Sequence, residues 1–259
     1  MNVYLISLEK SIGKRQKLMS AFPNSYKDFN IINGVVGNEL TATKYFNYTR
    51  YYSQKFRKLM TPGEVGCSLS HMQALEKIVD SKTCGLILED DVQGNEQSFL
   101  DLKRIETQIG DWDFYLLGTH PASKLEYILC ESTVFSEKVY KLNLSSLQFI
   151  YGAHCYVVGY KLAEHILENQ KKFLLPADIW PALIREPKVQ IYFTNLFEHP
   201  VISKENSSLE SDRAGIRYER SYLLLFYGLV RAFKMELLRI KIRCERIFLN
   251  KKSILKQDV

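Results

Sequence analysis

The sequence predicts an α/β fold built on a mostly parallel, mixed sheet. Short apolar runs of strand length alternate along the chain with segments of helical pattern, which is the order expected when helices cover the faces of a sheet. The 259 residues, 46% hydrophobic and 25% charged, are typical of a globular protein. In such sheets ligands bind outside the carboxyl ends of the strands, so residues that follow strands are the first candidates for a functional site.

The expected strands are short apolar runs bounded by turn residues. They cover residues 2–8, 29–34, 86–88, 112–118, 148–159 and 189–193. Helices are expected from about residue 11, over residues 61–79 and over residues 161–171. Residues 41–60 are rich in tyrosine and lysine without clear periodicity, so a loop is expected there. Four strand ends are expected to meet at one edge of the sheet, at Leu8, Gly34, the residues after Leu88, and Gly118.

One expected helix has a specific start signal. Thr61 fits the N-cap, Pro62 fits the first helical position, and Glu64 stands three residues after the cap. Threonine and glutamate at this spacing form a capping box, in which each side chain accepts a hydrogen bond from the other residue's backbone. The sequence therefore predicts a helix from this point to about Val79.

The apolar strand Leu86-Ile-Leu88 ends in three carboxylates, Glu89, Asp90 and Asp91. Like charges this close repel, so a cation is expected to neutralise them. Magnesium and manganese are suited to this, because they bind carboxylate oxygens and are often shared with substrate phosphates. A solvated turn or a helix N-cap would account for the same tripeptide, and the triplet alone leaves both interpretations open.

The charge of the chain is concentrated near its end. Residues 213–256 hold 12 Lys/Arg and 3 Asp/Glu, a net of +9, so the rest carries −3 of the formal +6. We therefore divide the chain into a body, residues 1–212, and a basic amphipathic helical tail, residues 213–259. The apolar positions of the tail recur every three or four residues, at Phe226, Leu229, Phe233, Leu237 and Ile240. The basic positions fall mainly on another side, at Arg231, Arg239, Arg243 and Arg246.

A basic amphipathic helix of this kind can lie on an anionic membrane leaflet, and residues 221–256 are expected to do so. The alternatives are a helix packed on the core and a helix that pairs in a homodimer. No apolar run approaches the length of a membrane span, and the first residues do not resemble a signal peptide. The five scattered cysteines indicate reduced thiols, so a cytosolic protein is expected, with no nucleic-acid partner.

Two long motifs resemble glycosyltransferase family 25, the bacterial lipooligosaccharide and lipopolysaccharide glycosyltransferases. They are Thr61-Pro-Gly-Glu-Val-Gly-Cys-Ser-Leu-Ser-His71 and Ile87-Leu-Glu-Asp-Asp-Val92. Shorter matches are Val3-Tyr-Leu-Ile-Ser-Leu8 with Arg15, Phe149-Ile-Tyr-Gly-Ala-His-Cys-Tyr156, and Pro176-Ala-Asp178. The resemblance spans roughly residues 1–212.

The resemblance implies a GT-A-like domain with a Rossmann-like sheet and transfer of a sugar from a nucleotide donor with inversion at the anomeric carbon. It implies a UDP-hexose donor, with UDP-galactose expected and UDP-glucose or UDP-N-acetylglucosamine as alternatives. The acceptor would be a lipid-linked oligosaccharide at the cytoplasmic face of a bacterial inner membrane. Ser7 stands where asparagine is frequent in the family and Ala153 where threonine is frequent, so donor or acceptor fit is expected to differ.

Under this interpretation Asp91 is the expected direct ligand of Mn²⁺ or Mg²⁺. Glu89 is a second metal candidate, and His199 stands late in the chain, where GT-A enzymes often supply a final ligand. The metal would bridge both phosphates of the donor. Contacts to the nucleotide-sugar are expected from Ser7, Leu8, Arg15, His71, Glu89, Asp90 and His154. His120 is expected to be a surface or packing residue.

Sugar transfer also needs a carboxylate that faces the acceptor hydroxyl. Asp178, in Leu175-Pro-Ala-Asp-Ile-Trp180, is the candidate general base. The structural alternative is that Asp178 caps the next short helix. Glu64 and Asp212 are weaker candidates for the same role.

Two other functions are consistent with parts of the sequence. A sugar nucleotidyltransferase would share the fold, but the first strand lacks the glycine- and lysine- or arginine-rich loop that binds a triphosphate. A membrane-surface binding module would account for the basic tail but not for the acid triplet. A GT-B enzyme is disfavoured, because its two nucleotide-fold domains generally need a longer chain.

Overall fold

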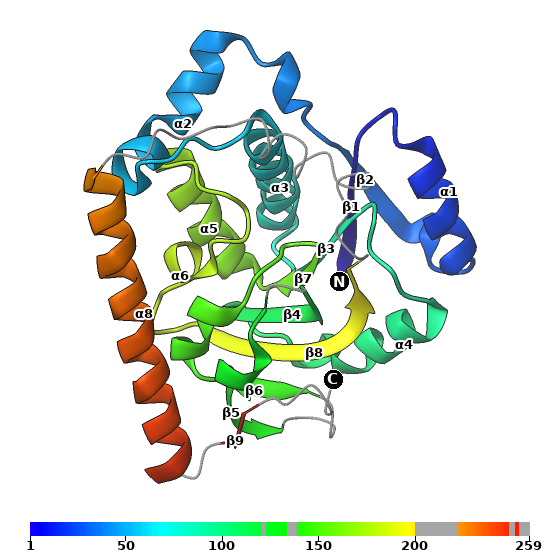
Figure 1. The fold of residues 1–259 in the computed structure, drawn as a ribbon. Helices are drawn as coiled ribbons and strands as arrows, with labels where there is room; N and C mark the ends of the chain where they lie inside the picture. Colours follow the sequence, from blue (N-terminus) through cyan, green and yellow to red (C-terminus); the bar gives the residue numbers. More distant parts are fainter. Residues whose placement is uncertain (121–122, 134–138, 200–221, 249–251, 254–259) are drawn as a thin grey trace.

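The computed structural model describes residues 1–120, 123–133, 139–199, 222–248 and 252–253. These residues form one central sheet with helices on both faces (Figure 1). One face of the sheet packs on α3 (Pro62–Ser81) and α5 (Tyr160–Lys172), and the other packs on α1 (Ile12–Ala21) and α4 (Glu96–Ile105). Adjacent residues of a strand point to opposite faces, so Ile87 enters one core and Leu86 and Leu88 enter the other.

The described strands form a single sheet of nine. In spatial order they are β2 (Phe29–Asn33), β1 (Asn2–Ser7), β3 (Gly85–Glu89), β7 (Cys155–Val158), β4 (Asp113–Thr119), β8 (Gln190–Glu198), β6 (Tyr140–Leu142), β5 (Leu129–Thr133) and β9 (Lys252–Ser253). The α/β class and the mixed sheet are confirmed. Parallel pairing is less extensive than predicted, because β1–β2, β1–β3 and β4–β8 are parallel and the other five described pairs are antiparallel.

Strand direction determines which residues meet at the functional edge. β1, β2, β3, β4 and β8 all run the same way, so their carboxyl ends lie at one edge of the sheet. β7 runs the opposite way between β3 and β4, which places its first residue at that same edge. The residues just after β3, β4 and β8 and the residue just before β7 are therefore neighbours across the sheet.

Helix α3 begins as the sequence predicted. The Thr61 side chain accepts a hydrogen bond from the Glu64 backbone at 3.0 Å, and the Glu64 carboxylate accepts one from the Thr61 backbone at 2.8 Å. The predicted capping box is confirmed.

Two expected elements were wrong. Residues 41–60 are mostly helical, since α2 spans Ala42–Phe56 and Thr41 caps its first turn. Tyr45 and Tyr52 pack on a small apolar cluster that includes Met60, and buried Thr49 lies between them at helical spacing. The helical period was present in the sequence, but tyrosine and threonine carry it in place of aliphatic residues. The predicted strand at 148–159 is confirmed only as β7, because a 3-10 helix covers Leu144–Phe149 and Gly152 has φ +90°.

The last described helix, α8 (Tyr222–Phe248), runs along one side of the body (Figure 1). Ile242 is buried, and Met235 and Leu238 pack against the main core, so one face of α8 is attached to the body. Arg239 and Arg243 lie over the Tyr127 ring at 5.5 and 5.8 Å. Among the helices of the described residues, none is long and apolar enough to cross a membrane. Part of the predicted tail, residues 213–221, 249–251 and 254–259, lies outside the described residues.

Candidate active site

The first carboxylate of the triplet, Glu89, ends β3 and is held by a buried hydrogen-bonded chain. His71 Nε2 lies 3.1 Å from Glu89 Oε1, and His71 Nδ1 lies 3.0 Å from the Tyr156 hydroxyl. A carboxylate only accepts, so His71 donates from Nε2 to Glu89. In that tautomer Nδ1 accepts from the Tyr156 hydroxyl, which has a proton to donate because burial raises the pKa of Tyr156 well above its ordinary value. This chain fixes the orientation of the Glu89 carboxylate.

The other two carboxylates differ in how fully they are paired. Asp90 accepts hydrogen bonds from Ser7 Oγ at 2.9 Å and from Lys14 Nζ at 2.8 Å. In the described part of the chain, Asp91 accepts one hydrogen bond, from Lys14 Nζ to Oδ2 at 3.4 Å. Its Oδ1 is buried and has no hydrogen-bond partner there. A buried carboxylate oxygen without a partner is costly. The three carboxylates are only partly exposed, and Asp91 is the member with an oxygen left to accept a further cation.

Arg15 braces the end of β1. Its guanidinium donates to Leu8 O at 2.6 Å, to Ser7 Oγ at 2.9 Å and to Glu9 O at 2.9 Å. Arg15 and Ser7 therefore lie beside the acid triplet, as expected, but the described hydrogen bonds of Arg15 go to the protein. Its predicted contact with phosphate stays a prediction.

Three histidines gather at the same edge, from the ends of three different strands. His154 precedes β7, His120 follows β4 and His199 follows β8. The ring centroid of His199 lies 5.0 Å from that of His154 and 5.2 Å from that of His120. A backbone bridge between Gln93 and Glu198 joins the segment after the triplet to the segment that leads into His199.

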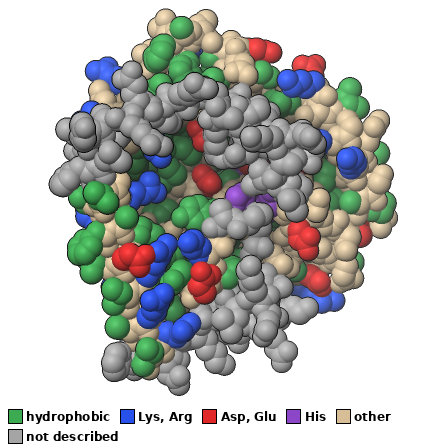
Figure 2. All heavy atoms as spheres, viewed as in Figure 1, with side chains coloured by type: hydrophobic (Ala, Val, Ile, Leu, Met, Phe, Trp, Pro, Cys, Tyr) green, Lys and Arg blue, Asp and Glu red, His purple; other side chains and the backbone are tan. Residues whose placement is uncertain are grey.

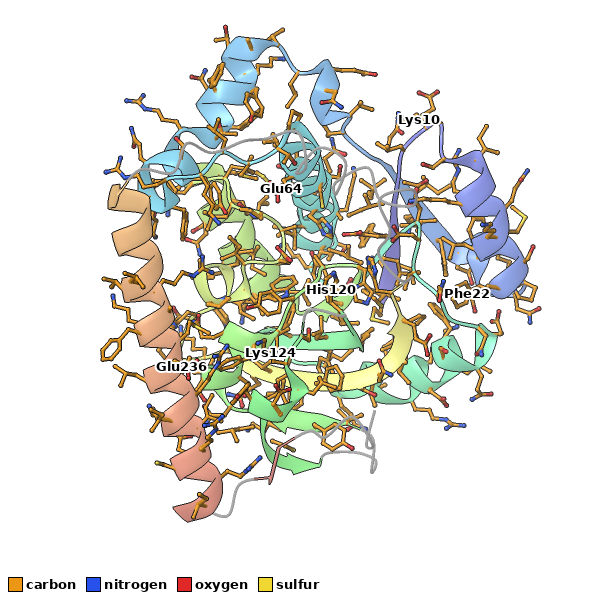
Figure 3. The ribbon with its side chains drawn as sticks, in the orientation of Figure 1. Lys10, Phe22, Glu64, His120, Lys124 and Glu236 are labelled. Atoms are coloured by element: carbon orange, nitrogen blue, oxygen red, sulfur yellow. The ribbon has the colours of Figure 1, made fainter. Side chains whose placement is uncertain are left out.

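His154 is buried, and neither of its ring nitrogens has a hydrogen-bond partner among the described residues. Burial, with smaller effects of His199 and His120, lowers its pKa to about 3. The imidazole is therefore neutral at physiological pH and has a nitrogen lone pair available. Gly118 permits this arrangement, since a Cβ at that position would lie 2.9 Å from His154 Nε2 and 2.2 Å from the Phe197 carbonyl oxygen. Figure 3 labels His120 at this edge.

Cys67, on α3, lies at the centre of the acidic group. Desolvation raises the pKa of its thiol well above the ordinary value, and the carboxylates Glu89, Asp178, Asp91 and Glu64 raise it further, in that order. Carboxylates from three segments of the chain therefore act on one thiol, and the Glu89 carboxylate lies 3.9 Å from Cys67 Sγ. Acidic (red) and histidine (purple) side chains are visible near one another on this face in Figure 2.

Asp178 does not cap the helix that follows it. The N-cap of α6 (Trp180–Leu183) is Ile179, and no side chain bonds there. Asp178 Oδ2 instead accepts the Gly152 backbone N–H at 3.4 Å, and the Gly152 carbonyl accepts Trp180 Nε1 at 3.0 Å. The carboxylate is thus held at the edge of the site. Of its two rivals, Glu64 is used in the capping box, and Asp212 lies outside the described residues.

This edge carries side chains of the types that bind divalent metals. Asp91 offers a buried oxygen without a partner, and His154 offers two unpaired ring nitrogens next to His199. Carboxylate oxygens suit Mg²⁺ and Mn²⁺, and imidazole is a common ligand of transition metals. Glu89, in contrast, points to His71 and Cys67.

The family model described as glycosyltransferase family 25 (LPS biosynthesis protein) matches residues 1–180. This range includes the acid triplet, Asp178, and the two α3 residues that contact Glu89, Cys67 and His71. The chain belongs to glycosyltransferase family 25. The predicted family is confirmed.

Curated relatives of this family 25 chain include a glycosyltransferase 25 family member of Anopheles gambiae and one of Aedes aegypti. Each is 29% identical over 126 residues, which is 45% of this chain and 21% of the relative. The procollagen lysyl hydroxylase and glycosyltransferase of Acanthamoeba polyphaga mimivirus is 29% identical over 195 residues, 68% of this chain and 20% of that protein. This chain therefore spans about a fifth of the length of these relatives.

Among solved structures, a glycosyltransferase involved in glycosylation of the major capsid of PBCV-1 is 12% identical. The match covers 82% of this family 25 chain and 98% of that chain, with a TM-score of 0.40. An apo UDP-glucose pyrophosphorylase is 8% identical over 76% of this chain and 74% of that chain, with a TM-score of 0.38. Likeness at these TM-scores is too weak to indicate function.

Four residues of the site in this family 25 chain were not identified from the sequence. Lys14 is one of several cations on a polar helix, and nothing local distinguishes it. Cys67 and His71 are four residues apart on α3 and so share one face of the helix. This spacing could have indicated from the sequence that Cys67 lies beside His71. Tyr156 and His120 come near the site only through the order of the strands, and the ring contact of His120 with His199 agrees with a packing role as well as with a functional one.

Proposed function

We propose that this chain transfers a hexose from a UDP-sugar to a lipooligosaccharide or lipopolysaccharide acceptor, with inversion and with Mn²⁺ or Mg²⁺. UDP-galactose is the expected donor. The observation that carries the proposal is the buried, unpaired oxygen of Asp91, at the same sheet edge as the Asp178 carboxylate. One site thus offers a ligand for a cation beside a diphosphate and a base for an acceptor hydroxyl.

We propose that Asp91 and His199 would hold the metal and that Glu89 is a weaker candidate. His154, which lies beside His199 and has no hydrogen-bond partner among the described residues, is proposed as a further ligand. When bound, the metal would supply positive charge to the diphosphate leaving group. Lys14 and Arg15, at the end of β1, add fixed positive charge on the same side. Ser7, Leu8, His71, Asp90 and His154 are the proposed lining of the nucleotide-sugar site.

Asp178 would act on the acceptor. Its carboxylate takes the proton of the acceptor hydroxyl while that oxygen bonds to the anomeric carbon and the bond from this carbon to UDP breaks. The Gly152 N–H fixes Asp178 Oδ2 and leaves the other carboxylate oxygen for this step. A positioned base of this kind typically contributes about 10²–10⁴-fold in rate.

The test is a donor screen with UDP-galactose, UDP-glucose and UDP-N-acetylglucosamine, each with truncated lipooligosaccharide, in Mn²⁺ and then in chelator. We expect chelator-sensitive release of UDP from one donor. Asp91→Asn should lower this release by at least about 100-fold, while Asp101→Asn, an exposed position on α4, should leave it unchanged. Turnover that is equal in Asp91→Asn would overturn the proposed role of Asp91. Formation of a nucleotide-sugar from UTP and a sugar phosphate would favour the nucleotidyltransferase alternative.

We further propose that α8 binds an anionic membrane surface, which is where a lipid-linked acceptor would be met. The predicted apolar stripe faces away from the body, because Leu229, Phe233 and Leu237 are 70%, 66% and 50% exposed. Ile240 and Ile247 continue the same side. Arg231, Lys234 and Lys241 are exposed along the helix.

Apolar side chains with basic residues beside them suit insertion into an anionic leaflet better than pairing with a second copy, where like charges would repel. Cytoplasmic-face localisation follows as part of this proposal.

Vesicle sedimentation tests this surface. The chain should sediment with vesicles rich in phosphatidylglycerol and much less with phosphatidylcholine vesicles. Phe233→Ser with Leu237→Ser should reduce binding by about 100-fold or more, since each buried apolar side chain contributes about 1.5–3 kcal/mol. Leu100→Ser, an exposed apolar position on α4, is the control. Equal binding of the double variant, or a concentration-dependent dimer that the double variant abolishes, would contradict the membrane proposal.

A further inference from the structure

We propose that Cys67, His71 and Glu89 form a second metal site, selective for zinc or another thiophilic transition metal and distinct from the proposed Mn²⁺ or Mg²⁺ ligands Asp91 and His199. The three ligand atoms come from α3 and the end of β3 and lie within 4.8 Å of one another. This inference goes beyond the proposed sugar transfer and does not depend on it.

The spacing of the ligand atoms suits a tetrahedral ion. Zinc bonds of about 2.0–2.1 Å to nitrogen and oxygen and about 2.3 Å to sulfur place neighbouring ligand atoms roughly 3.3–3.6 Å apart. Here His71 Nε2 lies 3.1 Å from Glu89 Oε1, and Cys67 Sγ lies 3.9 Å from the same oxygen. The Cys67 and His71 ligand atoms lie within 4.8 Å of each other, so shifts of up to about 1 Å would bring the three atoms onto one ion, with the fourth position open to water.

The surroundings also suit a thiophilic cation. Cys67 and His71 are one helical turn apart, which is the spacing that presents two ligands from one helix face. Tyr156 contacts the other ring nitrogen of His71 at 3.0 Å and can accept its N–H once Nε2 binds metal, which is a common way to orient a histidine ligand. Asp178, Asp91 and Glu64 add negative charge around the thiol.

The thiol distinguishes this site from the neighbouring one. Thiolate ligands favour zinc and similar ions, whereas carboxylate and water ligands favour Mg²⁺ and Mn²⁺. Binding would release the Cys67 proton and would commit the Glu89 carboxylate to the second ion. Occupied by zinc, the site would therefore hold Glu89 away from a nucleotide-sugar, and we expect zinc to inhibit the chain's transfer activity.

The experiment uses Co²⁺ as a spectroscopic substitute for zinc, with the whole chain free of other metals. A thiolate-to-cobalt charge-transfer band in the near ultraviolet, with visible bands of a tetrahedral ion, should appear at one equivalent and disappear when zinc is added. Cys67→Ser should remove the thiolate band, and His71→Gln should weaken Co²⁺ binding by more than about 10-fold. Cys244→Ser, which changes an exposed free cysteine on α8, is the matched control and should keep the band.

The outcomes separate this proposal from the proposed function. Asp91→Asn should keep the cobalt–thiolate band even though it loses sugar transfer. No thiolate band in the parent chain, or a band that Cys67→Ser leaves intact, would overturn the second site. Circular dichroism and thermal unfolding of each variant show whether it is folded, and Cys67→Asp, which keeps an ionisable ligand, should bind Co²⁺ without a thiolate band if the site is as described.

Discussion

Lys14 places its ammonium nitrogen 2.8 Å from Asp90 Oδ1, so α1 brings a cation to the acidic edge of the sheet. The same nitrogen lies 3.4 Å from Asp91 Oδ2. The sequence indicated that the triplet needs positive charge, and part of that charge comes from the protein. A metal that binds Asp91 must therefore bind beside Lys14 or displace it.

Lys14→Met should increase the affinity of the nucleotide-free chain for Mn²⁺ by about 3–10-fold, because an ammonium group roughly 4 Å from a bound cation opposes it by about 1 kcal/mol or more. Manganese titration followed by electron paramagnetic resonance measures this affinity. Lys17→Met makes the same charge change at an exposed position of α1 and should alter the affinity little. An unchanged or weaker affinity in Lys14→Met would show that Lys14 does not compete with the metal.

Tyr156→Phe should destabilise the fold by about 1–3 kcal/mol, because His71 Nδ1 would lose its buried donor. Urea unfolding gives the free energy change. The control is Tyr4→Phe, which removes a hydroxyl that donates a 3.2 Å, partly buried hydrogen bond to the Lys77 carbonyl. This substitution should lower the free energy of unfolding by a smaller amount. If both substitutions lower the free energy of unfolding equally, the buried hydrogen bonds that link Tyr156, His71 and Glu89 add no stability of their own.

Thr61→Ala should cost about 1 kcal/mol, within a range of about 0.5–2, because the Glu64 backbone N–H loses its acceptor and the capping box is broken. Thermal unfolding reports the loss. Thr41→Ala removes a single longer cap bond, 3.4 Å to the Lys44 backbone, and should cost less. The reverse order would contradict the reciprocal bonding seen at α3.

Asp113→Asn should stabilise the chain at neutral pH. Burial raises the pKa of the Asp113 carboxyl, so the folded state binds its proton more tightly than the unfolded state does. Stability from this group is then present below the unfolded pKa of about 3.9 and is lost as pH rises through the folded pKa. The asparagine oxygen can still accept the Gly110 N–H, which donates to Asp113 at 2.8 Å.

Urea unfolding between pH 4 and pH 7 tests this. The advantage of Asp113→Asn should be smallest at the acid end and grow as pH rises. Asp101→Asn, at an exposed position beside Arg104, is the control and should not gain stability with rising pH. An Asp113→Asn chain that is less stable than the parent at pH 7 would show that ionised Asp113 is favourable in the fold.

The sequence by itself determined the local features of this protein. Short apolar runs fixed β1, β2, β3 and β4, since a buried strand needs only a few apolar residues between turn signals. The Thr61 and Glu64 pair fixed the start of α3, because both partners of a capping box lie within one turn. The acid triplet and its neighbouring motif likewise identified the family.

Only the tertiary structure decided which side chains meet. β7 runs antiparallel between β3 and β4, so His154 reaches the edge that carries Asp91 and Tyr156 reaches His71. Lys14 contacts Asp90 across 76 residues of sequence. The outward direction of the apolar stripe on α8 depends on which face packs at Ile242. These relationships follow from strand order, register and packing between distant segments, and periodicity within a short window carries no information about them.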